Sequence, residues 1–194
     1  MLIRKIFLFS ILALLIHCNS FAQNKTDETK KYVTWTAMQL IPSPVFFQDQ
    51  NEDNARVIFG LRWQVTPINI AFKTNKYVSP VQFFMINPVR RFTGSVEMFV
   101  QPEWTTTGFR YSNLNRFGIS IGSRVILPIQ GEGENLSASI GGKYNYREDS
   151  YSDKNSYLGV EAGLYFFYGL MGVQFNYNFD SKTKYNIGLY IKYF

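Results

Sequence analysis

The feature that most constrains the fold of this chain is a strict alternation of apolar and polar side chains in its last two long segments. In 171–179 the odd positions carry Met, Val, Phe, Tyr and Phe, and the even positions carry Gly, Gln, Asn and Asn. In 185–193 the odd positions are again apolar or aromatic. A period of two indicates a β-strand with one face in an apolar environment. The short polar link 180–184 predicts that the two strands form a hairpin.

The same alternation recurs in the preceding residues, and it is least regular in the first segment, where Pro42 and Pro44 interrupt it. An even number of strands returns both chain ends to one side, as in bacterial membrane barrels. We therefore predict an all-β fold, a closed antiparallel transmembrane β-barrel of about eight strands, with ten strands as the alternative. The expected strands are 33–47, 57–65, 96–104, 117–127, 136–147, 158–168, 171–179 and 185–193.

The first residues of the chain predict export. Arg4 and Lys5 precede the apolar run 6–16, and the small residues Ser20 and Ala22 follow it. This is the pattern of a secretory signal peptide that is cleaved after Ala22. The apolar run is too short for a membrane anchor, which needs roughly 20 apolar residues.

We expect three parts in the chain: a signal peptide at 1–22, a flexible periplasmic tail at 23–31 and the barrel at 32–194. Lipidation of Cys18 is an alternative, but His17 stands where that route prefers a small residue. Cleavage would leave a mature chain without cysteine or histidine. Metal binding by those residue types is then excluded, and we expect neither a metal nor a cofactor.

The charged residues of the expected strands fall on the face opposite the apolar one. In a water-soluble sandwich this face would be hydrated, whereas in a membrane barrel it lines the interior and its cations pair with its acids. The signal peptide and the aromatic residues near the strand ends favour the membrane barrel. The residues expected in the interior charge network are Arg62, Glu97, Glu103, Arg124, Lys143, Arg147, Glu161 and Lys192.

In pattern, the mature chain resembles the small outer-membrane barrels of Gram-negative bacteria, the OmpA-like and OmpX-like eight-stranded class, of a Bacteroidota type. Its last strand, YNIGLYIKYF, resembles the C-terminal signal that the barrel-assembly machinery reads, carried here by Tyr190, Tyr193 and Phe194. The chain departs from that signal at Lys192, where an apolar residue is usual. The resemblance implies a location in the outer membrane, contact with its lipid, and the assembly machinery as a partner during biogenesis.

The segment 73–92 is longer than a periplasmic turn should be. Ser79 followed by Pro80 is typical of a helix start. We expect a short periplasmic helix near 80–87, at the membrane interface or in the barrel mouth, and the alternative is an extra hairpin that would give ten strands. The segment is a candidate for docking other envelope proteins, although arginines that reach the lipid interface are the simpler interpretation. Its docking residues would be Phe83, Phe84, Met85, Arg90 and Arg91.

The sequence argues against catalysis and against a wide pore. The barrel enzymes that this chain could resemble use a catalytic histidine, which the mature chain lacks, so we predict no catalytic residues. Glu97, Glu103 and Glu161 are conceivable general acids, but ion pairing inside a narrow barrel is favoured. Wide aqueous channels belong to barrels of about 16–18 strands. The acidic link 49–54 lacks the spacing of an EF-hand and is interpreted as a solvated outward loop.

A formal net charge of +6 does not indicate nucleic-acid binding, because the basic residues are scattered over the strands. We therefore expect a non-enzymatic outer-membrane protein, either structural or an accessory subunit of an envelope assembly. A lipid-modifying enzyme without a catalytic histidine and a surface ligand-binding barrel are the alternatives. No motif identifies a ligand, a partner or a process.

Overall fold

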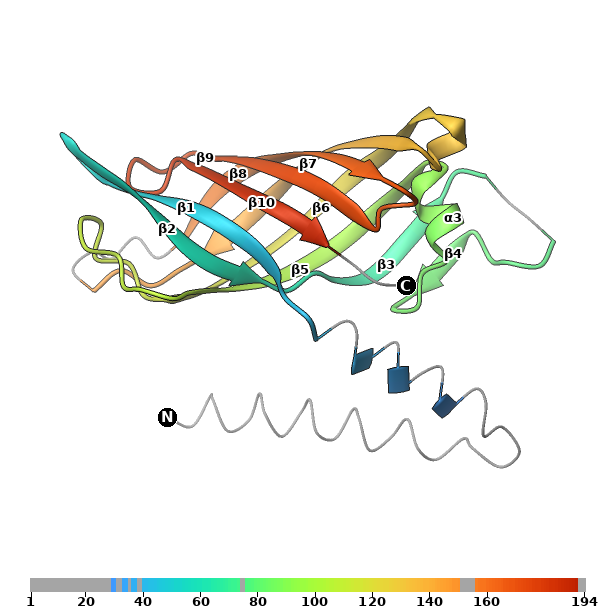
Figure 1. Cartoon of the computed structure of the whole chain (residues 1–194), viewed down its shortest axis with the longest axis horizontal. Helices are drawn as coiled ribbons and strands as arrows, with labels where there is room; N and C mark the ends of the chain where they lie inside the picture. The colour runs from blue at the N-terminus through green and yellow to red at the C-terminus, as the bar shows by residue number, and fades with distance from the viewer. Residues whose placement is uncertain are drawn as a thin grey trace. The chain divides into compact units, whose positions relative to one another are not determined.

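The computed structural model describes residues 29–30, 33–34, 36–37, 40–73, 76–150 and 156–191. The chain divides into two units, one up to residue 37 and a second from residue 38 onward. The second unit is a closed antiparallel barrel with two further strands and a short helix beside it (Figure 1). The expected signal peptide at 1–22 lies outside the described residues, as do residues 192–194.

Eight strands close the ring, in the order β2-β1-β10-β9-β8-β7-β6-β5, and β2 pairs with β5 to complete it. This confirms the predicted closed eight-stranded barrel. The ring strands are β1 (Ser43–Asn51), β2 (Asn54–Arg62), β5 (Ser95–Thr105), β6 (Phe117–Gln130), β7 (Leu136–Tyr146), β8 (Ser156–Phe166), β9 (Met171–Asn178) and β10 (Tyr185–Ile191). A 3-10 turn, η2 (Gly131–Gly133), links β6 to β7.

Two strands lie outside the ring. β3 (Val65–Ala71) follows β2 after a two-residue break and continues along β5. β4 (Val81–Phe83) pairs antiparallel with β3. The sheet therefore has ten strands, but only eight of them belong to the closed ring, so the alternative of a ten-stranded barrel is wrong.

The seam between the first and last ring strands is short, because β1 pairs with β10 only over Val45–Phe47. Side chains extend this seam in both directions. The Gln48 side chain accepts the N–H of Tyr185 at one end. At the other end Ser43 Oγ accepts the N–H of Ile191 and donates to its carbonyl. A backbone edge cannot remain unsatisfied in an apolar environment, so these side chains complete the ring.

The barrel is apolar outside and polar inside. Ile140, Leu158 and Ile187 point outward and are exposed. The alternate positions of the same strands carry Glu161, Asn186 and other polar residues that are buried. Water-soluble domains show the opposite distribution, since they place large apolar side chains inside.

The first strand differs from the prediction, since residues 33–34 and 36–37 are helical and β1 begins only at Ser43. β1 also continues to Asn51, through residues expected to form an outward loop. The cause is an unbroken ladder with β2 that ends in a tight turn, where Asn51 pairs with Asn54. The side chains of β1 therefore continue to point alternately inward and outward up to its end, although the last residues of the strand are polar.

The helix expected near 80–87 is also displaced, since that segment contains β4 and the helix α3 spans Pro88–Phe92. The Asn87 side chain accepts the N–H of Arg90, and Pro88 takes the first helical position. The helix start that was predicted at Ser79-Pro80 is instead formed by Asn87-Pro88, eight positions later. No helix in the described residues is long and apolar enough to cross a membrane.

Candidate functional site

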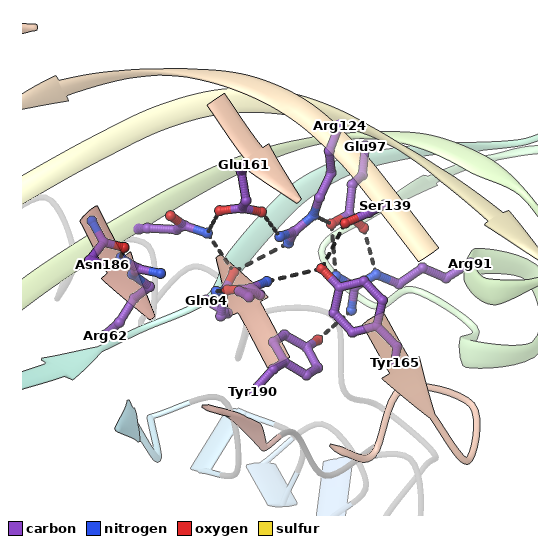
Figure 2. Close-up of polar contacts among 12 residues, drawn as sticks. Arg62, Gln64, Arg91, Glu97, Arg124, Ser139, Glu161, Tyr165, Asn186 and Tyr190 are labelled. Carbon is purple, nitrogen blue, oxygen red and sulfur yellow. Dashed lines mark hydrogen bonds and ion pairs between the residues drawn. The ribbon is translucent and has the colours of Figure 1, made fainter. Parts of the chain in front are cut away.

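The interior of the barrel contains one connected set of buried ion pairs, seen in Figure 2. Glu97 on β5 accepts hydrogen bonds from two arginines. Arg91 of α3 holds both carboxylate oxygens, with Nη2 donating to Oε1 at 2.8 Å. Arg124 on β6 pairs with Glu97 and also with Glu161 on β8. All four side chains are almost completely buried, so these pairs are shielded from water.

A second set of ion pairs lies farther along β5, around Glu103. The carboxylate of Glu103 pairs with Arg62 at 2.7 Å and with Arg147 at 3.0 Å. Arg62 Nη2 also donates to Asn186 on β10 at 2.8 Å, which links β2 to β10 across the intervening strand β1. Each interior glutamate is therefore held by at least one arginine.

Hydrogen bonds between neutral amide and hydroxyl side chains connect the strands around these charges. Gln101 donates to both Gln64 and Glu161. Gln64 donates to Gln174 at 2.8 Å, and Gln174 donates to the Tyr165 hydroxyl at 3.0 Å. The bonds from Gln101 to Glu161 and from Gln64 to Gln174 join parts of the wall that are not neighbours in the ring, so these polar side chains cross the interior.

Inward-facing glycines make room for the large charged side chains. A Cβ at Gly118 would lie 2.9 Å from the guanidinium of Arg147, and one at Gly141 would lie 2.5 Å from Cβ of Arg124. A larger residue at either position would displace an ion-paired arginine. The glycines of β6 and β7 therefore serve the packing of the interior.

Lys143 on β7 is the exception in this network. Its side chain is buried, yet its Nζ has no hydrogen-bond partner in the described part of the chain. The charges that act on it most strongly are those of Arg62, Glu103, Glu161 and Arg124. It lies among the interior charges without joining an ion pair with the described residues.

One end of the barrel, the α3 end, comprises α3, η2 and the turn 167–170. Phe92 is fully buried and its ring lies 5.4 Å from that of Tyr165. Gly169 in the turn has a φ of +76° and leaves no room for a Cβ beside the Phe92 ring. Arg91 Nη1 donates to the Tyr190 hydroxyl at 2.7 Å. Helix α3 thus closes this end with one aromatic ring and one ion-paired guanidinium.

The opposite end, the loop end, comprises the β1–β2 turn and the loop 106–116. The β1–β2 hairpin extends beyond the neighbouring strands there (Figure 1). Asp49 is buried, and its carboxylate accepts the backbone N–H groups of Arg110, Tyr111 and Ser112. Arg56 donates to the same carboxylate at 2.8 Å. One carboxylate therefore holds three consecutive amides of the loop.

The loop in turn fills the mouth of the barrel. Phe109 and Leu114 are buried and form a small apolar cluster with Phe47 and its neighbours. The guanidinium of Arg147 lies 5.0 Å from the centroids of both Phe47 and Phe109. Cation–π contacts of this kind are stronger away from water. The loop end is thus closed by apolar side chains that pack against the guanidinium of Arg147.

The structure places seven of the eight expected interior charges inside the barrel and buried. These are Arg62, Glu97, Glu103, Arg124, Lys143, Arg147 and Glu161. The eighth, Lys192, lies outside the described residues. Of the expected assembly signal, Tyr193 and Phe194 also lie outside them, and Tyr190 points inward, where its hydroxyl bonds Arg91.

The expected docking segment is divided by the structure. Phe83, Phe84 and Met85 are exposed. Arg90 donates to the carbonyl of Lys73 at the surface. The prediction that Arg91 is a docking residue is wrong. Its side chain is buried against Glu97 and cannot reach a docking partner or a lipid phosphate. Successive residues of a one-turn helix point in different directions, and only one of the two arginines faces the barrel.

Sequence reasoning missed Asp49. It appeared to belong to a solvated acidic loop, yet it holds the loop 106–116. The signal that could have found it is its parity, since Asp49 continues the inward positions of Val45 and Phe47. The interior glutamines were also not singled out, because neutral amides carry no obvious pairing rule.

The geometry of the site is suited to holding the barrel together. All three interior glutamates accept hydrogen bonds from arginines, which stabilises their charged form. A carboxylate engaged in this way is a poor general acid. No group of three or more His, Cys, Asp or Glu residues in the described ranges is arranged to hold a metal ion.

Comparison of the chain with protein-family models, with curated protein sequences and with solved structures finds no match.

Proposed function

We propose that this protein is a non-enzymatic outer-membrane β-barrel that serves as a structural or accessory subunit of an envelope assembly. The observation that carries the proposal is the closure of the barrel at both ends around an ion-paired interior. Phe92 closes one end and Phe109 closes the other. Such a barrel offers its outer surface and its end segments, and not its interior, to other molecules.

The apolar exterior supports the membrane part of the proposal. Outward-facing Phe, Ile, Leu and Val side chains stay exposed on every ring strand except β5, where Met98 takes this role. In water, an apolar surface of this extent would drive aggregation. A bilayer of about 30 Å hydrocarbon thickness is matched by tilted strands of 9–11 residues. Together with the expected signal peptide, this favours the outer membrane.

The interior contacts support the non-enzymatic part. The acids that were conceivable catalysts, Glu97, Glu103 and Glu161, are bound to arginines and lie between two closed ends. A lipid substrate would have to displace Phe92 or Phe109 to reach them. Filling of the interior also argues against conduction, as expected for a ring of eight strands.

The surface that we propose for docking is the tip of β4, formed by Phe83, Phe84 and Met85. Their exposed fractions are 62%, 54% and 38%, and they lie outside the closed ring. Apolar side chains clustered at a surface mark an interaction site more often than single ones do.

Native mass spectrometry of the protein, extracted from its own outer membrane in mild detergent, tests the assembly. We expect the barrel to be detected with other protein subunits. A variant in which Phe83, Phe84 and Met85 are all changed to Ser should lose these subunits and keep the heat-modifiable gel mobility of a folded barrel. The matched control is Phe167→Ser, which alters an equally exposed phenylalanine in the turn 167–170.

Detection of the barrel alone or with lipid only would contradict the assembly. Retention of every subunit by the triple variant would move the docking surface elsewhere. Ion conductance in planar bilayers, measured on the same preparation, is expected to be absent, and a stable open pore would refute the proposal that the interior is closed.

A surface ligand-binding barrel is the second candidate, and the loop end favours it. Asp49 holds the amides of Arg110, Tyr111 and Ser112 in one conformation. A loop that is ordered before it binds loses less entropy on binding. Exchange of residues 106–116 for an unrelated loop should abolish binding of such a ligand, and unchanged binding would rule this candidate out.

A further inference from the structure

The buried charges of the barrel interior do not balance. Among the described interior residues, five cations face three carboxylates. The carboxylate of Asp49 does not correct this, because it lies at the loop end and pairs with Arg56. The interior cations are Arg62, Arg91, Arg124, Lys143 and Arg147, and the acids are Glu97, Glu103 and Glu161. Uncompensated charge in a low-dielectric interior is costly, so an interior with excess positive charge attracts an anion.

The hydrogen-bond donors without acceptors identify where this excess lies. Three buried nitrogens have no partner in the described part of the chain: Lys143 Nζ, Arg62 Nη1 and Asn176 Nδ2. Two belong to cations, and the third belongs to the neutral amide of Asn176, whose oxygen is also without a partner. A fully buried donor without an acceptor destabilises the folded protein, and more so when it is charged.

The topology brings these donors to one region of the interior. Arg62 Nη2 bonds Asn186, and Asn186 is directly opposite Asn176 in the β10–β9 ladder. Asn176 is in turn opposite Glu161 in the β9–β8 ladder. Glu161 and Arg62 are both among the charges that act most strongly on Lys143.

Two glycines lie next to these donors, although the side chains of Asn178 and Asn145 occupy the space beside Gly159. Gly188 lies beside Arg62 Nη1, since a Cβ built on it would be 3.4 Å away. Gly159 is directly opposite Lys143 in the β7–β8 ladder. The two nearby acids cannot neutralise Lys143, because Glu103 is held by Arg62 and Arg147 and Glu161 is held by Arg124.

We propose that Lys143, Arg62 and Asn176 form a buried site for a small inorganic anion of chloride size. The three donors come from three strands, β7, β2 and β9. The anion is monoatomic because the interior of an eight-stranded barrel has little space beyond its side chains. The anion lowers the excess positive charge and accepts hydrogen bonds from the three unpartnered nitrogens. This site does not depend on the proposed function of the barrel.

Thermal unfolding of the mature protein in detergent tests the site. At equal ionic strength, sodium chloride should raise the Tm above its value in sodium gluconate, whose anion is too large to enter. The increment should grow with chloride concentration, as for any ligand of the folded state alone. Lys143→Met should remove the increment. Lys73→Met, which alters an exposed lysine at the α3 end, should keep it.

A second variant works in the opposite direction. Asn176→Asp supplies a fixed carboxylate at the site, so it should raise the Tm in gluconate and abolish the chloride increment. In crystals grown with bromide, the anomalous map should show a peak within hydrogen-bond distance of Lys143 Nζ. An equal chloride increment in wild type and Lys143→Met would overturn the proposal. So would a bromide map with no peak and only water at this position.

Discussion

At the α3 end, the barrel is closed by Phe92 and by Arg91, whose guanidinium is paired with Glu97 deep in the interior. At the loop end, it is closed by Phe109 and Leu114, which belong to an irregular loop held by Asp49. The first closure is thus part of the interior charge network. The second rests on the network through Arg147 but is held by a carboxylate at the rim.

This difference indicates how far the loss of a contact at each end would spread through the barrel. Loss of a contact at the α3 end disturbs Glu97, which also binds Arg124 on another strand. Loss of Asp49 frees backbone amides of one loop, and water can satisfy them once the loop opens. We therefore expect changes at the α3 end to destabilise the whole barrel and changes at the loop end to remain local.

The largest expected effect is that of Glu97→Gln. It leaves two buried arginines, Arg91 and Arg124, with one carboxylate fewer. Removing one partner of a buried ion pair typically costs about 3–5 kcal/mol. Equilibrium unfolding in denaturant, with the barrel in micelles, measures the loss. A change below about 1 kcal/mol would mean that water reaches the interior and replaces the carboxylate.

The two aromatic closures allow a matched pair of substitutions. Phe92→Ala should cost about 3 kcal/mol, at the low end for a buried phenylalanine, because the cavity opens beside Tyr165. Phe109→Ala should cost clearly less, since its loop can collapse onto Phe47. Denaturant unfolding of both variants under the same conditions makes the comparison. If Phe109→Ala were the more damaging, the assignment of the global closure to the α3 end would be wrong.

Asp49→Asn should have a smaller and local effect. The amide can no longer accept all the N–H groups of Arg110, Tyr111 and Ser112 with a full charge. We expect a cost of about 1–2 kcal/mol, as for loss of charged hydrogen bonds. Hydrogen exchange should accelerate in residues 106–116 and remain unchanged in β6 to β10. Faster exchange throughout the barrel would show that the two ends are coupled.

The smallest effect is expected for the surface of the α3 end. Lys73 and Glu132 form an ion pair at 3.1 Å, and both side chains are more than half exposed. Such pairs contribute little, because water and salt screen them. Glu132→Gln should therefore leave the unfolding midpoint unchanged. A clear loss would mean that this end depends on surface charge as well as on Phe92 and Glu97.

Several elements followed from the sequence because they depend on local pattern alone. The alternation in 171–179 and 185–193 specified two strands and the residues that share each face, and the structure has them as β9 and β10. The number of ring strands followed from the same pattern. Element boundaries did not, since β1 runs on to Asn51 although its residues become polar. Pairing with β2 keeps these residues in the strand. A local sequence pattern does not indicate which strand pairs with which.

The sequence by itself determined that the charged residues of the strands lie on one face, opposite the apolar side chains. This is so because period-two alternation decides a side chain's face without reference to any other strand. Only the tertiary structure decided that Arg91 turns inward to Glu97, that Asp49 holds the loop 106–116, and that Lys143 remains without an ion pair. These contacts depend on the register between strands and on where the end segments fold back. They join residues far apart in the sequence, and no local periodicity encodes them.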